Sequence, residues 1–333
     1  MVQATRDVGS ISAFETAHLV RYDDLVPCRT AFIDTRTPGS ERKENFTIIG
    51  PGVAENPDQH VHIAAPHGFN IGGARQPPGC VNSQHSHETA EVFIVHSGRW
   101  AFRLGENAED AEVVLEPGDT ISIPTHVFRG FENVGEDAGF LFAVLGGDDP
   151  GRVLWAPYVF EQAEEYGLVL MEDGSLYDSG SGAPMPTHTQ PQTPTSAAEV
   201  AELDRLDNDQ LRRCVLRHDA LAYRSIPERT IDEAPIIGAA GEGLGPAPLD
   251  WPHGFHVRCI EIQPGTEGCA YSFDTPEVLL GFRGEIDVEL PAGRIRFQSG
   301  DTLSVPAGVN RQLTNRGAEA ATLFVVRGGD AIE

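Results

Sequence analysis

Hydrophobic and polar residues alternate along many short segments of this chain. In Arg99-Trp-Ala-Phe-Arg-Leu104 the large apolar side chains stand at every second position, and Glu285-Ile-Asp-Val-Glu-Leu290 alternates more strictly still. A period of two places successive side chains on opposite faces, which is typical of a half-buried antiparallel strand. Gly, Pro and Asp separate such segments throughout, so we expect many short strands joined by turns rather than long helices.

The chain also repeats itself over a distance too long for a solenoid. Three segments of the first half return in the second, and they are Val20-Arg-Tyr-Asp-Asp-Leu25 with Leu216-Arg-His-Asp-Ala-Leu221, Ala65-Pro-His-Gly-Phe69 with Trp251-Pro-His-Gly-Phe255, and Leu115-Glu-Pro-Gly-Asp-Thr-Ile-Ser-Ile-Pro124 with Phe297-Gln-Ser-Gly-Asp-Thr-Leu-Ser-Val-Pro306. The repeat predicts two copies of one module, and the short, turn-separated strands predict that each module is a closed β-barrel.

A segment rich in Gly, Pro, Ser and Thr, residues 179 to 195, lies between the copies and is typical of a linker. Ser196-Ala-Ala-Glu199 then fits a capping box, and apolar residues follow it at helical spacing, which predicts one short helix. We place the boundary near residue 190, with an N-terminal domain at 1–190 that includes the linker and a C-terminal domain at 191–333. The predicted fold is all-β, with two tandem jelly-roll-type barrels and a short interdomain helix.

Composition removes several classes of partner. The chain has 50 Asp plus Glu against 24 Lys plus Arg, a net charge of −26, which argues against nucleic acid and against an anionic membrane. It contains no apolar run of about 18 residues, the length that a membrane helix needs. The five cysteines form no CxxC pair and are odd in number, so neither a disulfide framework nor a zinc knuckle is indicated. The first residues lack the apolar core of a signal peptide, and we expect a soluble, cytoplasmic protein.

The residues that carry chemistry gather between Gly79 and Gly98. With His85, His87 and Glu91, these glycines resemble the first cupin motif (Gly, five residues, HxH, three residues, Glu, six residues, Gly) at every fixed position. Residues two apart on a strand point to the same side, so His85 and His87 can both face a barrel interior, where Glu91 can join them. Two imidazoles and one carboxylate form a facial triad that suits Fe(II) and leaves positions open for oxygen or substrate. Mn, Ni, Co and Zn are also compatible with these ligands.

A second cupin motif follows, with its fixed residues retained at Gly118, Pro124 and Asn133. His126 replaces the second glycine of that motif, and Arg129 replaces its histidine, which in the family is the fourth ligand. Arginine cannot ligate because it has no acceptor atom. Arg129 therefore binds a carboxylate or enolate of a substrate that also contacts the metal, or it pairs with Glu91 or Glu132 and leaves the site weak or empty. A third alternative is that His126 moves in as a substitute ligand. We name Arg129 and His126 as candidate catalytic residues.

The second copy lacks the ligand set. At the aligned positions it has Tyr271, Phe273 and Glu277, and Arg311 again stands where the second motif has histidine. A phenyl ring cannot bind a metal ion, so we expect the C-terminal barrel to be metal-free and to have a structural role. A ligand pocket that contains Arg311 and Tyr271 but no metal is the alternative.

The two-barrel plan resembles that of quercetin dioxygenase, gentisate-type dioxygenases and oxalate decarboxylase, the last less well because both of its copies keep their ligands. The resemblance implies a metal-dependent enzyme, in the first place a non-heme Fe(II) dioxygenase that acts on a small phenolic or organic-acid substrate in the N-terminal barrel. The expected partner is a small, anionic molecule, and the family also leads us to expect a homodimer. The second hypothesis is a non-catalytic, or isomerase- or lyase-type, bicupin that binds a small anionic ligand.

Overall fold

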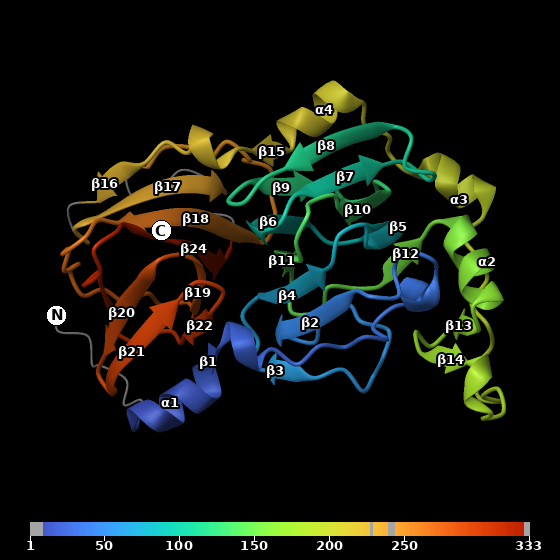
Figure 1. The fold of residues 1–333 in the computed structure, drawn as a ribbon, viewed down its shortest axis with the longest axis horizontal. Helices are drawn as coiled ribbons and strands as arrows, with labels where there is room; N and C mark the ends of the chain where they lie inside the picture. Colours follow the sequence, from blue (N-terminus) through green and yellow to red (C-terminus); the bar gives the residue numbers. More distant parts are fainter. Residues whose placement is uncertain (1–8, 227–228, 239–243, 330–333) are drawn as a thin grey trace. The chain divides into compact units, whose positions relative to one another are not determined.

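The computed structural model describes residues 9–226, 229–238 and 244–329. Antiparallel strands dominate the described chain, and its helices are short (Figure 1), which confirms the all-β prediction. The chain packs into two compact units, each made of more than one stretch. We call the unit of Val26–Val61 and Asn70–His218 the N-terminal barrel, and the unit of Met1–Leu25, His62–Phe69 and Asp219–Glu333 the C-terminal barrel.

Two antiparallel sheets form the N-terminal barrel. The larger has the strand order β15-β9-β6-β11-β4-β2-β3, the smaller has the order β12-β5-β10-β7-β8, and β13-β14 is a separate hairpin. The strands are β2 (Glu44–Ile49), β3 (Val61–Ile63), β4 (Phe69–Gln76), β5 (Val81–His87), β6 (Glu91–Ser97), β7 (Trp100–Leu104), β8 (Ala111–Leu115), β9 (Thr120–Ile123), β10 (Arg129–Asn133), β11 (Gly139–Gly146), β12 (Val153–Trp155), β13 (Leu168–Leu170), β14 (Leu176–Asp178) and β15 (Val215–Leu216). Phe93, Phe102 and Phe131 pack together in its core, with ring centroids 5.1 to 5.4 Å apart.

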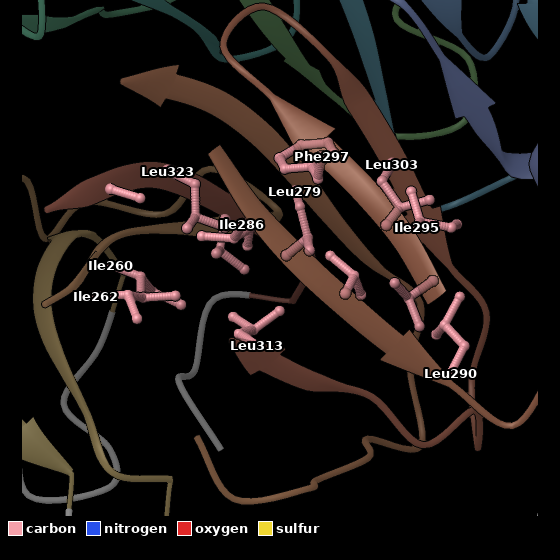
Figure 2. Packing of buried hydrophobic residues seen from close by; sticks show 14 of the residues in the cluster. Ile260, Ile262, Leu279, Ile286, Leu290, Ile295, Phe297, Leu303, Leu313 and Leu323 are labelled. Atoms are coloured by element: carbon pink, nitrogen blue, oxygen red, sulfur yellow. The ribbon is translucent and has the colours of Figure 1, made fainter. Parts of the chain in front are cut away.

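The C-terminal barrel also contains two sheets, with the orders β1-β22-β19-β24-β18-β17-β16 and β21-β20-β23. Its strands are β1 (Leu19–Val20), β16 (Arg224–Ile226), β17 (Ile231–Ile237), β18 (Phe255–Ile262), β19 (Glu277–Arg283), β20 (Glu285–Leu290), β21 (Gly293–Gln298), β22 (Thr302–Val305), β23 (Gln312–Thr314) and β24 (Ala321–Gly328). Every second residue of β20 is buried, as its sequence predicts. Figure 2 shows Ile286 and Leu290 of this strand among the aliphatic side chains of the core.

In the described part of the chain, four short α-helices accompany the strands: α1 (Ile11–His18), α2 (Pro157–Glu165), α3 (Ala197–Glu202) and α4 (Asn208–Arg213). Helix α3 begins at the predicted capping box, where the Glu199 amide donates to Ser196 Oγ at 3.3 Å and the Ser196 amide donates to Glu199 Oε2 at 2.7 Å. Among the described residues, no helix has the length and apolar character needed to cross a bilayer.

Each repeated copy contributes its first strand to the sheet of the other copy. Strand β1 pairs with β22 in the C-terminal barrel, and the equivalent strand β15 pairs with β9 in the N-terminal barrel. An arginine after each strand anchors it, because Arg21 Nη1 donates to Asp301 Oδ2 at 2.7 Å and Arg217 Nη1 donates to Asp119 Oδ2 at 2.6 Å. The boundary near residue 190 stays a prediction about the sequence copies, whereas the packing units divide the chain differently.

Candidate metal centre

Strands β5 and β6 bring three candidate ligands to one corner of the N-terminal barrel. His85 and His87 lie two residues apart on β5 of the smaller sheet, and Glu91 is the first residue of β6 in the larger sheet. A short turn between the strands therefore moves the chain from one sheet to the other and turns the carboxylate toward the imidazoles. One ligand atom from each residue lies within 4.8 Å of the others, and all three side chains are buried.

The electrostatics of this cluster keep its imidazoles in the form that binds metals. Burial, reinforced by the charge of Arg129, lowers the pKa of His85 to about 3. Burial and the neighbouring His85 hold the pKa of His87 well below its usual range. Burial raises the pKa of Glu91 to about 7, against the opposing effect of Arg129. Both histidines are thus neutral at neutral pH, as metal ligation requires.

The donor atoms of the cluster fit a divalent ion. His87 Nε2 lies 3.4 Å from Glu91 Oε1, and the two imidazole rings are 5.0 Å apart. His87 Nδ1 and Glu91 Oε2 are buried without a hydrogen-bond partner among the described residues. Buried polar atoms without partners are rare in folded proteins, and here they belong to two of the three candidate ligands. Two imidazoles and one carboxylate are a set that first-row divalent metals accept.

A buried network of polar groups fixes the orientation of His85. Its Nδ1 lies 2.8 Å from the carbonyl oxygen of Ser83, which can only accept, so Nδ1 carries the proton and Nε2 keeps its lone pair. The Ser83 amide donates to Asp34 Oδ2 at 3.0 Å. Lys43 Nζ donates to Asp34 Oδ1 and, at 2.9 Å, to Asn82 Oδ1. The side chains of Lys43 and Asp34 are fully buried, so this ion pair lies directly behind the ligand strand.

No motif in the sequence pointed to Lys43 and Asp34, although one signal was available. Lys43 is the only lysine among the 24 basic residues of the sequence. Every other basic residue of the sequence is arginine, so a lysine at this position is unusual. The ammonium group is compact, whereas a wider guanidinium has more N–H donors that would each need an acceptor in a buried position.

Trp155 supports the same imidazole from a neighbouring strand. It pairs with His85 in the register of β12 and β5, and the two rings lie 5.4 Å apart. The indole Nε1 donates to Glu55 Oε1 at 2.6 Å, and the amide of Ile33 donates to the other oxygen at 2.7 Å. Burial raises the pKa of Glu55 to about 8. Glu55 therefore fixes the indole that packs against His85, a role that no sequence motif indicated.

Arg129 lies beside the carboxylate ligand. It is fully buried on β10, opposite His85 in the strand register, and its Nε is 3.7 Å from Glu91 Oε2. Its Nη2 donates to the carbonyl oxygens of Ile123 and Pro124 at 3.3 and 3.2 Å. Glu132, the other carboxylate considered, instead pairs with Arg103 at 2.6 Å. A direct role of Arg129 in substrate binding stays a prediction.

His126 is exposed and lies outside the ligand cluster. Its φ of 60° is a left-handed conformation that favours glycine, which explains the glycine of the motif at this position, and the equivalent Gly308 has a φ of 74°. The His126 amide donates to the carbonyl oxygen of His87 at 3.3 Å. Both histidines border an open groove of about 460 Å³ that also contains Arg152. The catalytic role of His126 stays a prediction.

A cavity of about 80 Å³ adjoins the candidate ligands. The wall includes polar residues on or near β2 and β5, together with glycines and one cysteine. Its other lining residues are mainly apolar: Ala31, Phe32, Phe46, Val53, Ala54, Ala74, Phe93, Phe131, Ala143, Leu145, Val153 and Trp155. The cluster thus faces a small, largely apolar space, as a site for a small molecule requires.

In the C-terminal barrel, ion pairs take the place of the ligand cluster. Glu277 begins β19 as Glu91 begins β6, but Arg311 Nη2 and Nε lie 2.5 and 3.0 Å from Glu277 Oε2. Arg258 approaches the other oxygen at 3.4 Å. Burial alone would raise the pKa of Glu277, yet these guanidinium groups outweigh it and the pKa is lowered. Arg327 stacks on Phe273, its Cζ 3.5 Å from the ring centroid.

The comparisons with known proteins agree with this geometry. Residues 74–145, which contain all three candidate ligands, match the Cupin domain family. Germin-like protein subfamily 1 member 4 of Arabidopsis thaliana is 27% identical over 141 residues, which are 40% of this chain and 63% of that protein. The chain thus spans less than two thirds of the length of this curated relative.

Solved structures resemble the chain along almost its whole length. Oxalate decarboxylase of Lactobacillus farciminis, in a formate complex, has a TM-score of 0.59 at 13% identity, and the match covers 98% of this chain and 89% of that one. Oxalate decarboxylase from Bacillus subtilis has a TM-score of 0.54 at 12% identity, with 98% and 78% covered. At such identities the likeness concerns the fold alone. The chain thus contains a Cupin domain at residues 74–145, and over almost its whole length its fold resembles that of the oxalate decarboxylase structures.

Proposed function

We propose that the N-terminal barrel holds one divalent metal ion, with Fe(II) favoured, and that the protein is a metal-dependent oxygenase acting on a small organic-acid or phenolic substrate. The observation that carries the proposal is the buried cluster of His85, His87 and Glu91, whose ligand atoms lie within 4.8 Å of one another beside a largely apolar cavity. Three protein ligands on one side leave positions for a substrate, as in the facial triads of non-heme iron enzymes.

The residues of the chain have separate tasks in this proposal. His85 Nε2, the imidazole of His87 and the carboxylate of Glu91 hold the ion, which when bound polarises a chelating oxygen and lowers the pKa of a substrate hydroxyl. Arg129, 3.7 Å from Glu91, favours the ionised form of that carboxylate. Phe93 and Phe131 supply apolar wall that excludes water from the reacting group.

A second candidate function is non-oxidative chemistry on a small acid, such as decarboxylation. The observation that favours it is the fold likeness to two oxalate decarboxylases across 98% of the chain. Cupin barrels with the same ligands serve many reactions, so the choice between the two depends on the reaction that the metal-loaded protein performs.

The first experiment is elemental analysis of protein purified without chelators, before and after loading with Fe(II). We expect about one ion per chain, lost in His85→Ala and retained in His188→Ala, a matched control at an exposed histidine. Absence of metal from the loaded wild type would refute the proposal.

Oxygen uptake by the Fe(II)-loaded protein then separates the two reactions. Uptake with phenolic or 2-oxo acids supports the oxygenase. Release of carbon dioxide from oxalate without oxygen uptake supports the second candidate instead.

A further inference from the structure

The wall of the cavity has one charged side and one uncharged side. The ligand Glu91 stands on β6, and Asn45, Phe46 and Thr47 stand on β2, three strands away in the order β6-β11-β4-β2. Neighbouring strands lie about 4.8 Å apart, so β2 is roughly 14 Å from β6 when measured along the sheet. A molecule bound to the metal therefore directs the rest of its structure toward β2 and the adjoining loop.

Among the described residues that line the cavity, Glu91 is the one with a charged side chain. Apart from the imidazoles of His85 and His87, the other polar lining groups are uncharged amides, a hydroxyl and a thiol, contributed by Asn45, Thr47, Gln59, Asn82 and Cys28. The nearby Lys43 is already paired with Asp34 and is not among the lining residues. A second carboxylate near β2 would therefore lose its hydration without gaining a cation, which costs far more than burying an apolar group there. The head of the ligand can be anionic because the ion faces it, but its tail must be uncharged.

The apolar lining and the volume define that tail further. Phe46, Phe93, Phe131 and Leu145 offer aromatic and aliphatic contacts. The cavity of about 80 Å³ is roughly half of the 150 Å³ that holds a benzene molecule in an engineered protein core. An aliphatic tail of about three or four carbon atoms fits this space, and a larger ring requires the wall to move.

The polar groups near β2 leave one hydrogen bond open. Thr47 Oγ1 donates to Gln59 Oε1, and Gln59 Nε2 donates to the carbonyl oxygen of Pro51 at 2.9 Å. The Thr47 hydroxyl and both polar atoms of the Gln59 amide therefore already have hydrogen-bond partners. Asn45 Nδ2 is buried and has no hydrogen-bond partner among the described residues. An uncharged oxygen in the tail can accept from it, whereas a carboxylate there would still lack a counter-charge.

We infer that the N-terminal barrel selects 2-oxo or 2-hydroxy acids with a short, uncharged, mostly apolar tail, and rejects those whose tail carries a second carboxylate. The inference rests on the proposed metal site, since the ion binds the head of the ligand. It narrows the proposed substrate class from small organic acids in general to those acids whose tails fit the uncharged wall beside β2.

The test is a binding measurement on protein loaded with Co(II), an ion whose visible absorption reports ligand binding without turnover. Titration with Co(II) alone comes first and must show one site per chain. The Co(II)-loaded protein is then titrated with three ligands. 2-Oxopentanoate and 2-oxosuccinate have the same chelating head and differ in the charge of the tail, and glyoxylate has the head without a tail. We expect 2-oxopentanoate to bind at least tenfold more tightly than either of the others.

A variant at the uncharged wall makes the test specific. Gln59→Arg places a guanidinium in the lining and should bring the two tailed ligands to similar affinity or reverse their order. Gln162→Arg, at an exposed position of α2, is the matched control and should leave the preference unchanged. Failure of Co(II) to bind would overturn the metal site and this inference together. One bound Co(II) with equal affinities for the two tailed ligands would overturn the inference and leave the metal site standing.

Discussion

Replacing Lys43 with methionine tests the network behind His85. The change keeps an unbranched stem of the same length but removes the ammonium group. It leaves the carboxylate of Asp34 fully buried, with the Ser83 amide as its remaining donor among the contacts described. Breaking a buried ion pair at one partner costs roughly 3–5 kcal/mol of folding free energy. Because Ser83 also fixes the tautomer of His85, we expect metal affinity to fall by roughly 10- to 100-fold, as for outer-shell groups in other metal sites.

The stability is measured by urea unfolding in a Trp251→Phe background. The remaining Trp100 and Trp155 lie in the core of the N-terminal barrel, so their fluorescence reports the unfolding of that barrel. Co(II) titration of the folded variant provides the affinity. Arg99→Met is the control, because it removes the cation of an exposed pair in the same barrel and should cost no more than about 1 kcal/mol.

We expect Asp34→Asn, added to Lys43→Met, to restore part of the stability because it removes the unpaired charge. If Lys43→Met lost no more stability than Arg99→Met and kept its metal affinity, the network would have no role in positioning His85.

Three further predictions concern other parts of the fold. Burial lowers the pKa of His96 to about 4, so the unfolded chain takes up a proton at higher pH than the folded protein does. The contribution of His96 to stability is complete above about pH 6.5 and falls by about 3 kcal/mol as the pH drops to 4, in addition to the contributions of His85 and His87. His96→Gln should therefore reduce the loss of stability between pH 7 and 4, measured by urea unfolding, by about 3 kcal/mol. Glu277→Gln leaves the buried guanidinium of Arg311 without its carboxylate, whereas Arg258 keeps Glu233 at 2.6 Å. It should cost the C-terminal barrel roughly 3–5 kcal/mol in thermal unfolding, with the metal content unchanged, and a loss below about 1 kcal/mol would contradict this account of the barrel interior. Arg21→Ala removes a partly exposed hydrogen bond to Asp301 and should cost the C-terminal barrel about 1–2 kcal/mol of stability. Trp251 fluorescence should show this loss as a lower unfolding midpoint of the C-terminal barrel. A lower midpoint of the N-terminal barrel would contradict the observed pairing of β1 with β22.

The sequence pattern was sufficient for the strands and for the proximity of the candidate ligands. A period of two put His85 and His87 on one side of a strand, and the spacing to Glu91 matched a turn into the next strand. Such local rules work because each depends on residues within one or two elements.

The supports of the cluster depend on contacts that spacing along the chain does not reveal. Asp34 and Lys43 reach Ser83 and Asn82 across about 40 to 50 residues of sequence, and no periodicity connects them. The contacts of Arg129 could not be predicted either, because the motif shows only that arginine replaces the fourth ligand. Its bonds to two main-chain carbonyls and its distance to Glu91 required the folded barrel.

The exchange of first strands escaped the sequence analysis for a different reason. The segment that contains β1 and the segment that contains β15 are copies of each other, and so are their partners β22 and β9. Pairing within a copy and pairing between copies therefore satisfy the same pattern of apolar and charged residues.

This exchange makes the order of synthesis matter. When a ribosome has released residues 1–190, the barrel that contains the candidate ligands still lacks β15, so the edge of its larger sheet at β9 exposes unpaired main-chain groups. Such an edge pairs readily with other chains. Strand β1 must in turn wait for β22, which is translated about 280 residues later. We therefore expect the nascent chain to depend on protection from aggregation until β22 has emerged.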